Sequence, residues 1–135
     1  MDLQIGKEAT RSKVITIDDI KKYAEITGDY NPLHFDLDFA KNTKFGDIVV
    51  QGGITSGLLN ALVAMEMPGP GSVFLNQNLQ YSAPVYVGDI ITAIGKITKL
   101  HETKPVTTLN VEIRNQKDEV VLSGVCVCYT FSGKV

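Results

Sequence analysis

The sequence has no long hydrophobic run and no excess of basic charge, and it contains only two cysteines. No apolar run approaches the length of a membrane span, and the first residues lack the apolar core of a signal peptide. The formal net charge of −2 is not basic enough for a nucleic-acid-binding protein. We therefore expect a protein of the cytoplasm or of an organelle matrix, with no nucleic acid and no membrane among its partners.

The two cysteines, Cys126 and Cys128, lie two residues apart in an apolar, strand-like run. Side chains at this spacing point to the same face of a strand and are too close in sequence for an ordinary structural disulfide. They also do not form a Cys-x-x-Cys motif. We interpret them as buried thiols in a reducing compartment.

Length and composition indicate an ordinary globular protein. The chain has 135 residues, of which 44% are hydrophobic and 21% charged, and it shows no internal repeat, low-complexity tract or linker. This length is enough to bury roughly two-thirds of the unfolded surface. We expect a single domain over residues 1–135.

Residues 28–34 bring a carboxylate, an amide and an imidazole together around a proline. Pro32 disfavours the helical conformation at Asn31, and Gly28 can adopt the left-handed conformation that ends a helix. The resulting turn can direct Asp29 and His34 to one point, which suits acid-base chemistry. The same residue types also suit an ordinary turn, in which Asp29 is a cap and His34 a loop histidine.

A second motif, Gln51-Gly52-Gly53, stands directly before an apolar helix. The first N–H groups of a helix have no partner within it, and the helix dipole favours negative charge there. A glycine at this position lets a substrate approach closely. The glycines also suit a tight strand-to-helix turn, and that turn would itself expose the N–H groups.

These residues resemble the MaoC-like, or hydratase 2, family of (R)-specific enoyl-CoA hydratases. The resemblance rests on residues 28–34 with Tyr23 upstream, and it continues through residues 67–72 and 83–89, so that it covers most of the chain. It implies that Asp29 and His34 are the catalytic pair and that Asn31 orients the site. It also implies that the backbone N–H of Gly52 polarises the thioester carbonyl.

Two positions depart from the family pattern. Gln51 stands where many relatives carry a histidine, and Gly57 falls where some bacterial relatives carry a serine. Gln51 can form hydrogen bonds but cannot titrate, so no acid-base role is expected of it. Gln51, Gly53 and Ser56 are further candidate substrate contacts.

Hydrophobic periodicity predicts the order of the elements. A capping box of Thr16 and Asp19 begins a helix that ends at Gly28, and Asp36 suits the N-cap of a short second helix. A largely buried central helix is predicted over residues 53–67. A first strand or hairpin is expected within residues 5–15, and further strands at residues 72–82, 89–100, 106–115 and 120–131.

One long buried helix followed by antiparallel strands is typical of a helix wrapped by a curved sheet. This is the α+β hot-dog fold, which the resemblance also implies. The last strand is apolar on both sides and is expected to be central. Free sheet edges and the family resemblance together favour a homodimer or a higher oligomer.

The resemblance implies hydration of trans-2-enoyl thioesters, or the reverse dehydration, without a cofactor. A metal site at His34, Asp36 and Asp38 is not expected, because Asp36 suits an N-cap, Asp38 suits the first turn of a helix, and no cysteine or second histidine completes a set of ligands. The substrate is expected to be an acyl-CoA or acyl-carrier-protein thioester; the sequence does not distinguish them. Two alternatives are a hot-dog thioesterase, although Glu66 is the only carboxylate of the central helix, and a non-catalytic domain that binds acyl thioesters.

Overall fold

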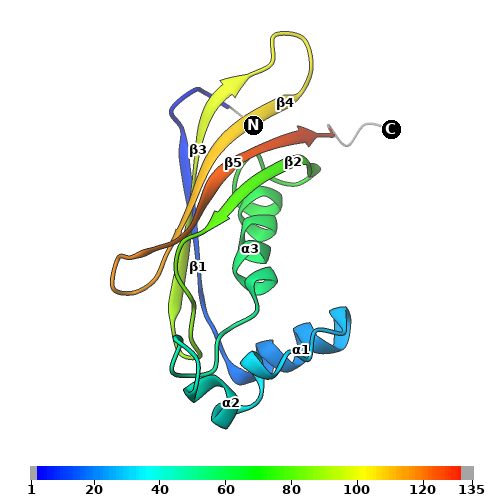
Figure 1. Cartoon of the computed structure of the whole chain (residues 1–135). Coiled ribbons are helices and arrows are strands. Elements are labelled where there is room, and N and C mark those ends of the chain that lie inside the picture. Colours follow the sequence, from blue (N-terminus) through cyan, green and yellow to red (C-terminus); the bar gives the residue numbers. More distant parts are fainter. Residues whose placement is uncertain (1–2, 132–135) are drawn as a thin grey trace.

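The computed structural model describes residues 3–131, which form a five-stranded antiparallel sheet with helix α3 packed against one face (Figure 1). The strands lie in the order β1-β3-β4-β5-β2. Helices α1 and α2 lie beyond one end of the sheet. This is the predicted hot-dog arrangement. The elements are β1 (Glu8–Val14), α1 (Ile17–Thr27), η1 (Pro32–His34), α2 (Leu37–Lys41), α3 (Gly52–Ala61), η2 (Leu62–Glu66), β2 (Ser72–Tyr81), β3 (Ile90–Leu100), β4 (Val106–Arg114) and β5 (Val120–Thr130).

The strand predictions are confirmed for β2 to β5 to within one residue at each end. In β4 buried and outward-facing residues alternate: Leu109, Val111 and Ile113 are buried, while the residues between them face outward. Residues 115–119 connect β4 to β5, and these two strands pair antiparallel as predicted. The weakly patterned first segment forms a strand, β1, at the sheet edge beside β3.

The prediction for the last strand is only half right. β5 is an interior strand, but it lies next to the edge strand β2, and β4 is the middle strand. Because α3 covers one face of the sheet, the other face of β5 stays open and Val125 is 42% exposed. Val121 and Leu122 are nevertheless both buried, since the β4–β5 register shifts beside them and places consecutive side chains inward.

Helix α1 begins and ends as the sequence predicts. The Thr16 hydroxyl accepts a hydrogen bond from the Asp19 N–H at 3.2 Å, and the Thr16 N–H donates to the Asp19 carboxylate at 2.9 Å. Gly28 is left-handed with φ 81°, and its N–H donates to the Ala24 carbonyl at 2.8 Å. The chain therefore leaves α1 in a fixed direction and enters the turn that carries Asp29.

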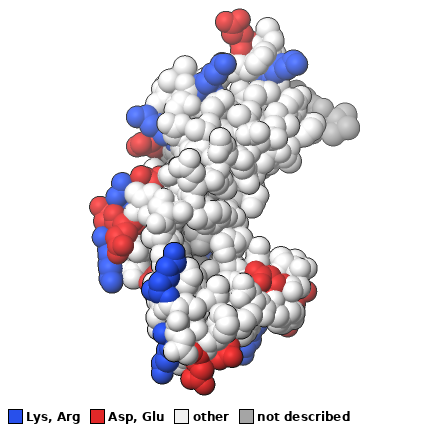
Figure 2. Space-filling model, viewed as in Figure 1, with Lys and Arg blue, Asp and Glu red and all other residues white. Residues whose placement is uncertain are grey.

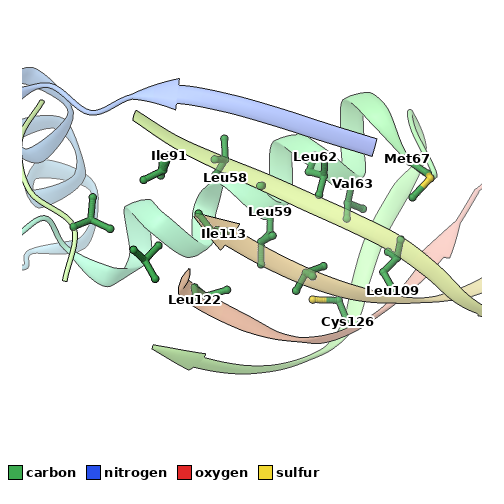
Figure 3. Packing of buried hydrophobic residues seen from close by; sticks show 14 of the residues in the cluster. Leu58, Leu59, Leu62, Val63, Met67, Ile91, Leu109, Ile113, Leu122 and Cys126 are labelled. Atoms are coloured by element: carbon green, nitrogen blue, oxygen red, sulfur yellow. The ribbon is translucent and has the colours of Figure 1, made fainter. Parts of the chain in front are cut away.

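The core lies between α3 and the sheet (Figure 3). Leu58, Leu59 and Leu62 are among the helix side chains that pack there. The single predicted helix of residues 53–67 is α3 followed by a π-helical turn, η2. A π turn has more residues than an α turn, so it shifts the phase of the side chains. Although the helix was predicted to be largely buried, Met65 near its end is therefore 61% exposed.

Cys126 and Cys128 are fully buried, unpaired thiols, as predicted. Burial raises the pKa of Cys126 to about 11 and that of Cys128 to about 12. Both thiols therefore stay protonated at neutral pH and act as small apolar groups of the core.

Within residues 3–131, no helix is long and apolar enough to cross a bilayer.

Candidate active site

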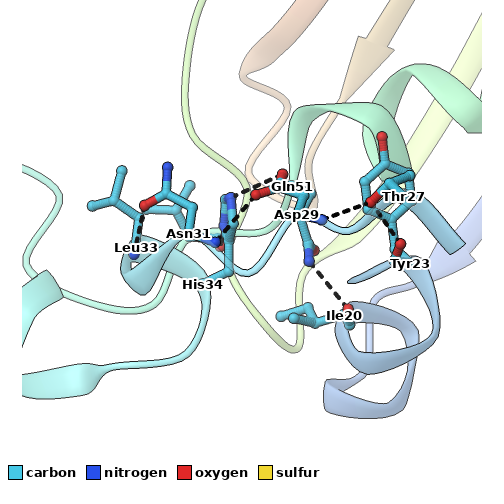
Figure 4. A network of polar contacts seen from close by, with 9 residues as sticks. Ile20, Tyr23, Thr27, Asp29, Asn31, Leu33, His34 and Gln51 are labelled. Carbon is cyan, nitrogen blue, oxygen red and sulfur yellow. Dashed lines mark hydrogen bonds and ion pairs between the residues drawn. The ribbon is translucent and has the colours of Figure 1, made fainter. Parts of the chain in front are cut away.

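The turn after α1 brings Asp29 and His34 together (Figure 4). The Asn31 N–H donates to Asp29 Oδ1 at 3.2 Å, and the Asn31 side chain accepts from the Leu33 N–H at 3.1 Å, which starts the short helix η1. The other carboxylate oxygen, Oδ2, lies 3.6 Å from His34 Nε2. Asn31 thus orients the carboxylate through its main chain, and Pro32 helps to begin the turn of 3₁₀ helix that carries His34.

His34 is held in one orientation from its opposite side. Its Nδ1 lies 2.5 Å from the carbonyl oxygen of Val49. Because a carbonyl can only accept, Nδ1 carries the proton of this hydrogen bond and Nε2 faces Asp29. The distance of 3.6 Å between Nε2 and the carboxylate is longer than a direct hydrogen bond. This distance leaves no room for a water between the two atoms, but a water beside the pair can contact both groups at once.

The segment that contains Val49 is fixed by contacts with the connection between β2 and β3. The Val50 N–H donates to the Val85 carbonyl at 2.8 Å, and Val49 forms an antiparallel bridge with Tyr86. The Tyr86 hydroxyl donates to the Phe45 carbonyl at 2.9 Å. Sequence reasoning missed this support for His34, because the partners are backbone carbonyls far along the chain and leave no residue-type signal.

A cavity of about 550 Å³ opens beside His34. The segment of residues 45–50 forms one of its walls, and the connection from β2 to β3 forms another. Gly52 lies in the lining, so the start of α3 faces the same space as His34. The side chains of the lining are mainly apolar. The apolar members are Phe45, Val49, Val50, Ala83, Pro84 and Val85, and the polar members besides His34 are Lys44, Thr55, Tyr81, Ser82 and Tyr86.

The two glycines at the start of α3 are each covered by a tyrosine. A Cβ on Gly52 would lie 3.1 Å from the Tyr81 ring, and a Cβ on Gly53 would lie 1.6 Å from the Tyr23 hydroxyl oxygen. Among residues 3–131, no group accepts the N–H of Gly52 or of Gly53. The turn therefore presents backbone donors at the positive end of the helix dipole, as the sequence predicts.

Gln51, Gly53 and Ser56 do not line the cavity, although they were candidate substrate contacts. The Gln51 side chain points to α1 and donates to the Ile20 carbonyl at 3.1 Å, while the Ser56 hydroxyl donates to the Gly53 carbonyl at 3.4 Å. Gly53 is covered by Tyr23. The cavity thus gives no support to direct contact with substrate at these three positions. Gln51 Oε1 is buried without a hydrogen-bond partner among the described residues.

The remaining polar candidates have structural roles. Asp36 is the N-cap of α2, and its carboxylate accepts from the Phe39 N–H at 3.1 Å. His101, the second histidine of the chain, is an exposed loop residue, and its Nδ1 accepts from the Lys104 N–H at 3.0 Å. Within residues 3–131, no cluster of three or more His, Cys, Asp or Glu side chains could hold a metal ion.

Comparison with known proteins decides the family. A family model described as a MaoC like domain matches residues 3–121. The chain belongs to the MaoC-like family. This agrees with the resemblance carried by residues 28–34, whose geometry the structure shows to be a paired carboxylate and imidazole.

Two named relatives of this MaoC-like chain match it over most of their length. It is 36% identical to an "(R)-specific enoyl-CoA hydratase" of Aeromonas caviae, over 93% of both chains. It is 37% identical to a "3-hydroxybutyryl-CoA dehydratase" of Methylorubrum extorquens, over 91% of this chain and 78% of the relative. A solved (R)-hydratase structure from A. caviae superposes with a TM-score of 0.91 at 35% identity, covering 96% of this chain and 98% of that one.

Proposed function

We propose that this chain is a hydro-lyase that hydrates trans-2-enoyl-CoA to (R)-3-hydroxyacyl-CoA, or catalyses the reverse dehydration. The observation that carries the proposal is the Asp29–His34 pair, 3.6 Å apart, beside a largely apolar cavity into which the start of α3 also faces. Hydration needs a base for water, a proton for C2 and a donor for the thioester oxygen. Asp29, His34 and Gly52 are the residues proposed to meet these three needs.

In the proposed step, a water held beside Asp29 and His34 gives a proton to the Asp29 carboxylate while its oxygen forms a bond to C3 of the enoyl thioester. The π electrons of the double bond move toward the thioester oxygen, and C2 takes a proton from His34 in its imidazolium form. The proton on Asp29 then returns to His34, which restores both groups. Acid-base groups held in this way each contribute about 10²–10⁴-fold to a rate.

The negative charge that develops on the thioester oxygen is stabilised at the start of α3. The Gly52 N–H is the proposed donor, because Gly52 lines the cavity. Backbone donors of this kind contribute roughly 3–4 kcal/mol to the stability of a transition state. The Tyr81 ring packs on Gly52 and keeps this turn compact.

The site favours hydration over thioester hydrolysis. A hot-dog thioesterase would need a carboxylate on or near the central helix to activate water. Glu66 belongs to η2, at the end of the helix far from Gly52, and it accepts a hydrogen bond from Arg11 at 3.0 Å. The Asp29–His34 pair also speaks against a purely binding role, because turn formation alone does not need an imidazole held beside the carboxylate.

The test is the loss of enoyl ultraviolet absorbance from crotonyl-CoA, followed in parallel with an assay for free thiol. We expect absorbance to fall without thiol release, and chiral analysis to give the (R)-3-hydroxybutyryl product. Thiol release would make the protein a thioesterase. Neither signal, across short and long acyl chains, would favour the binding-domain alternative. Acyl-carrier-protein thioesters run beside CoA thioesters would identify the carrier.

We further propose that the chain forms a homodimer through the β2 edge. An edge strand has unpaired backbone groups, and Val73 and Leu75 on β2 are 49% and 57% exposed. Figure 2 shows few charged side chains over the face that holds β2 and α3. Light scattering should give about twice the chain mass of 14.7 kDa.

A matched pair of variants tests the place of this dimer contact. Leu75→Lys on β2 should shift the protein toward monomers, because a buried charge without a partner opposes association. Val125→Lys, on the open face of β5, should leave the dimer intact. The opposite pattern would place the contact elsewhere.

The two buried, unpaired thiols support our proposal that the protein works in a reducing compartment, either the cytoplasm or an organelle matrix.

A further inference from the structure

The cavity beside His34 has one buried polar side chain that the proposed mechanism does not use, Thr55. Its exposed fraction is 3%, and it lines the cavity together with Gly52. The two residues are three apart in α3, so they lie on one face of the helix, with Thr55 about one turn further from its start. If the thioester group of a substrate lies at Gly52, an acyl chain that follows this wall of the cavity therefore passes Thr55.

The Thr55 hydroxyl has no hydrogen-bond partner among residues 3–131. The hydroxyl of a helical threonine can donate to the carbonyl four residues earlier. Here that carbonyl, of Gln51, accepts the Ile54 N–H at 3.0 Å and receives no hydrogen bond from the Thr55 hydroxyl. Among residues 3–131, Gln51 Oε1 is the only fully enclosed side-chain oxygen or nitrogen that has no hydrogen-bond partner. Because the Thr55 hydroxyl also has no partner, it is not fully enclosed and keeps some exposed surface. The space that Thr55 borders is the cavity beside His34.

We infer that Thr55 is a specificity-determining residue, which makes the enzyme select short acyl chains over long alkyl chains. The inference rests on the proposed function, and it adds the class of substrate. With a short chain, room remains for water to satisfy the hydroxyl. A long alkyl chain replaces that water with methylene groups, which leave the hydroxyl buried and unpaired, and this lowers the affinity for long substrates.

The inference is tested with the variant Thr55→Val, which has nearly the same shape and lacks the hydroxyl. We expect kcat/KM for trans-2-octenoyl-CoA, relative to crotonyl-CoA, to rise about tenfold, which corresponds to about 1.4 kcal/mol. Thr55→Ser keeps the hydroxyl and should keep the wild-type ratio. Thr107→Val is the matched control, because Thr107 is also a buried threonine but lies in β4 outside the cavity. It should leave the ratio unchanged.

A binding measurement separates this inference from the proposed function. Octanoyl-CoA and butyryl-CoA cannot be hydrated, so calorimetry with them reports affinity alone. Thr55→Val should bind octanoyl-CoA about tenfold more tightly than the wild type does, with butyryl-CoA unchanged. An unchanged or weakened preference for octanoyl-CoA would overturn the inference, whether or not the enzyme hydrates crotonyl-CoA. A failure of wild-type hydration with the expected binding shift would overturn the proposed activity only.

Discussion

Replacing Asp29 with asparagine should lower kcat for the hydration of crotonyl-CoA by about 10³-fold, within the range for a general base. The reason is that an amide cannot take the proton from water. The turn itself should survive, since an asparagine side-chain oxygen can still accept the Asn31 N–H that now donates to Asp29 Oδ1. Steady-state kinetics with a thermal melt will check both parts of this expectation.

Asp36→Asn is the matched control for this prediction. Asp36 is the N-cap of α2, and asparagine is an equally good N-cap, so this variant also removes one carboxylate without removing a structural contact. Its kcat should match that of the wild type. Loss of activity in both variants would point to a general effect of charge. Full activity in Asp29→Asn would rule out Asp29 as the base.

Replacing Gly124 with alanine should lower the free energy of unfolding by about 3 kcal/mol, at the upper end of the usual cost of overpacking. Gly124 pairs with Leu79 across the β5–β2 boundary, and a Cβ there would lie 2.0 Å from the Asn78 carbonyl oxygen. A backbone atom cannot move aside as a flexible side chain can. The two strands must separate locally, and the thermal midpoint should fall by roughly 10 °C.

Gly57→Ala is the comparison variant, because this substitution is expected to raise the thermal midpoint instead of lowering it. Gly57 lies within α3, and no heavy atom lies within 4 Å of the position where its Cβ would be. Alanine is the better helix former by about 0.5–1 kcal/mol, so this variant should melt at a slightly higher temperature. Equal midpoints for both variants would mean that β2 and β5 are less closely paired than the structure shows. Because β2 carries Tyr81, which packs on Gly52, the loss of strand pairing should also reduce activity.

Local chemistry explains why much of the fold was predictable. Capping at Thr16 and Asp19, the left-handed Gly28 and the alternation of β4 each depend on residues close together in the sequence. The π-helical turn at η2 had no such signal, and so the exposure of Met65 was missed. The open face of β5 was missed for a related reason. An apolar strand does not reveal which of its faces a helix will cover.

The sequence by itself determined the strand–helix order and the turn that holds Asp29 and His34. It did so because proline, glycine and capping side chains restrict the backbone within a few residues. Only the tertiary structure decided that Val49 orients His34, that Tyr23 covers Gly53 and that Thr55 borders the cavity. These contacts join residues of separate elements. Their partners are set by the packing of the whole chain, which no local pattern of residues records.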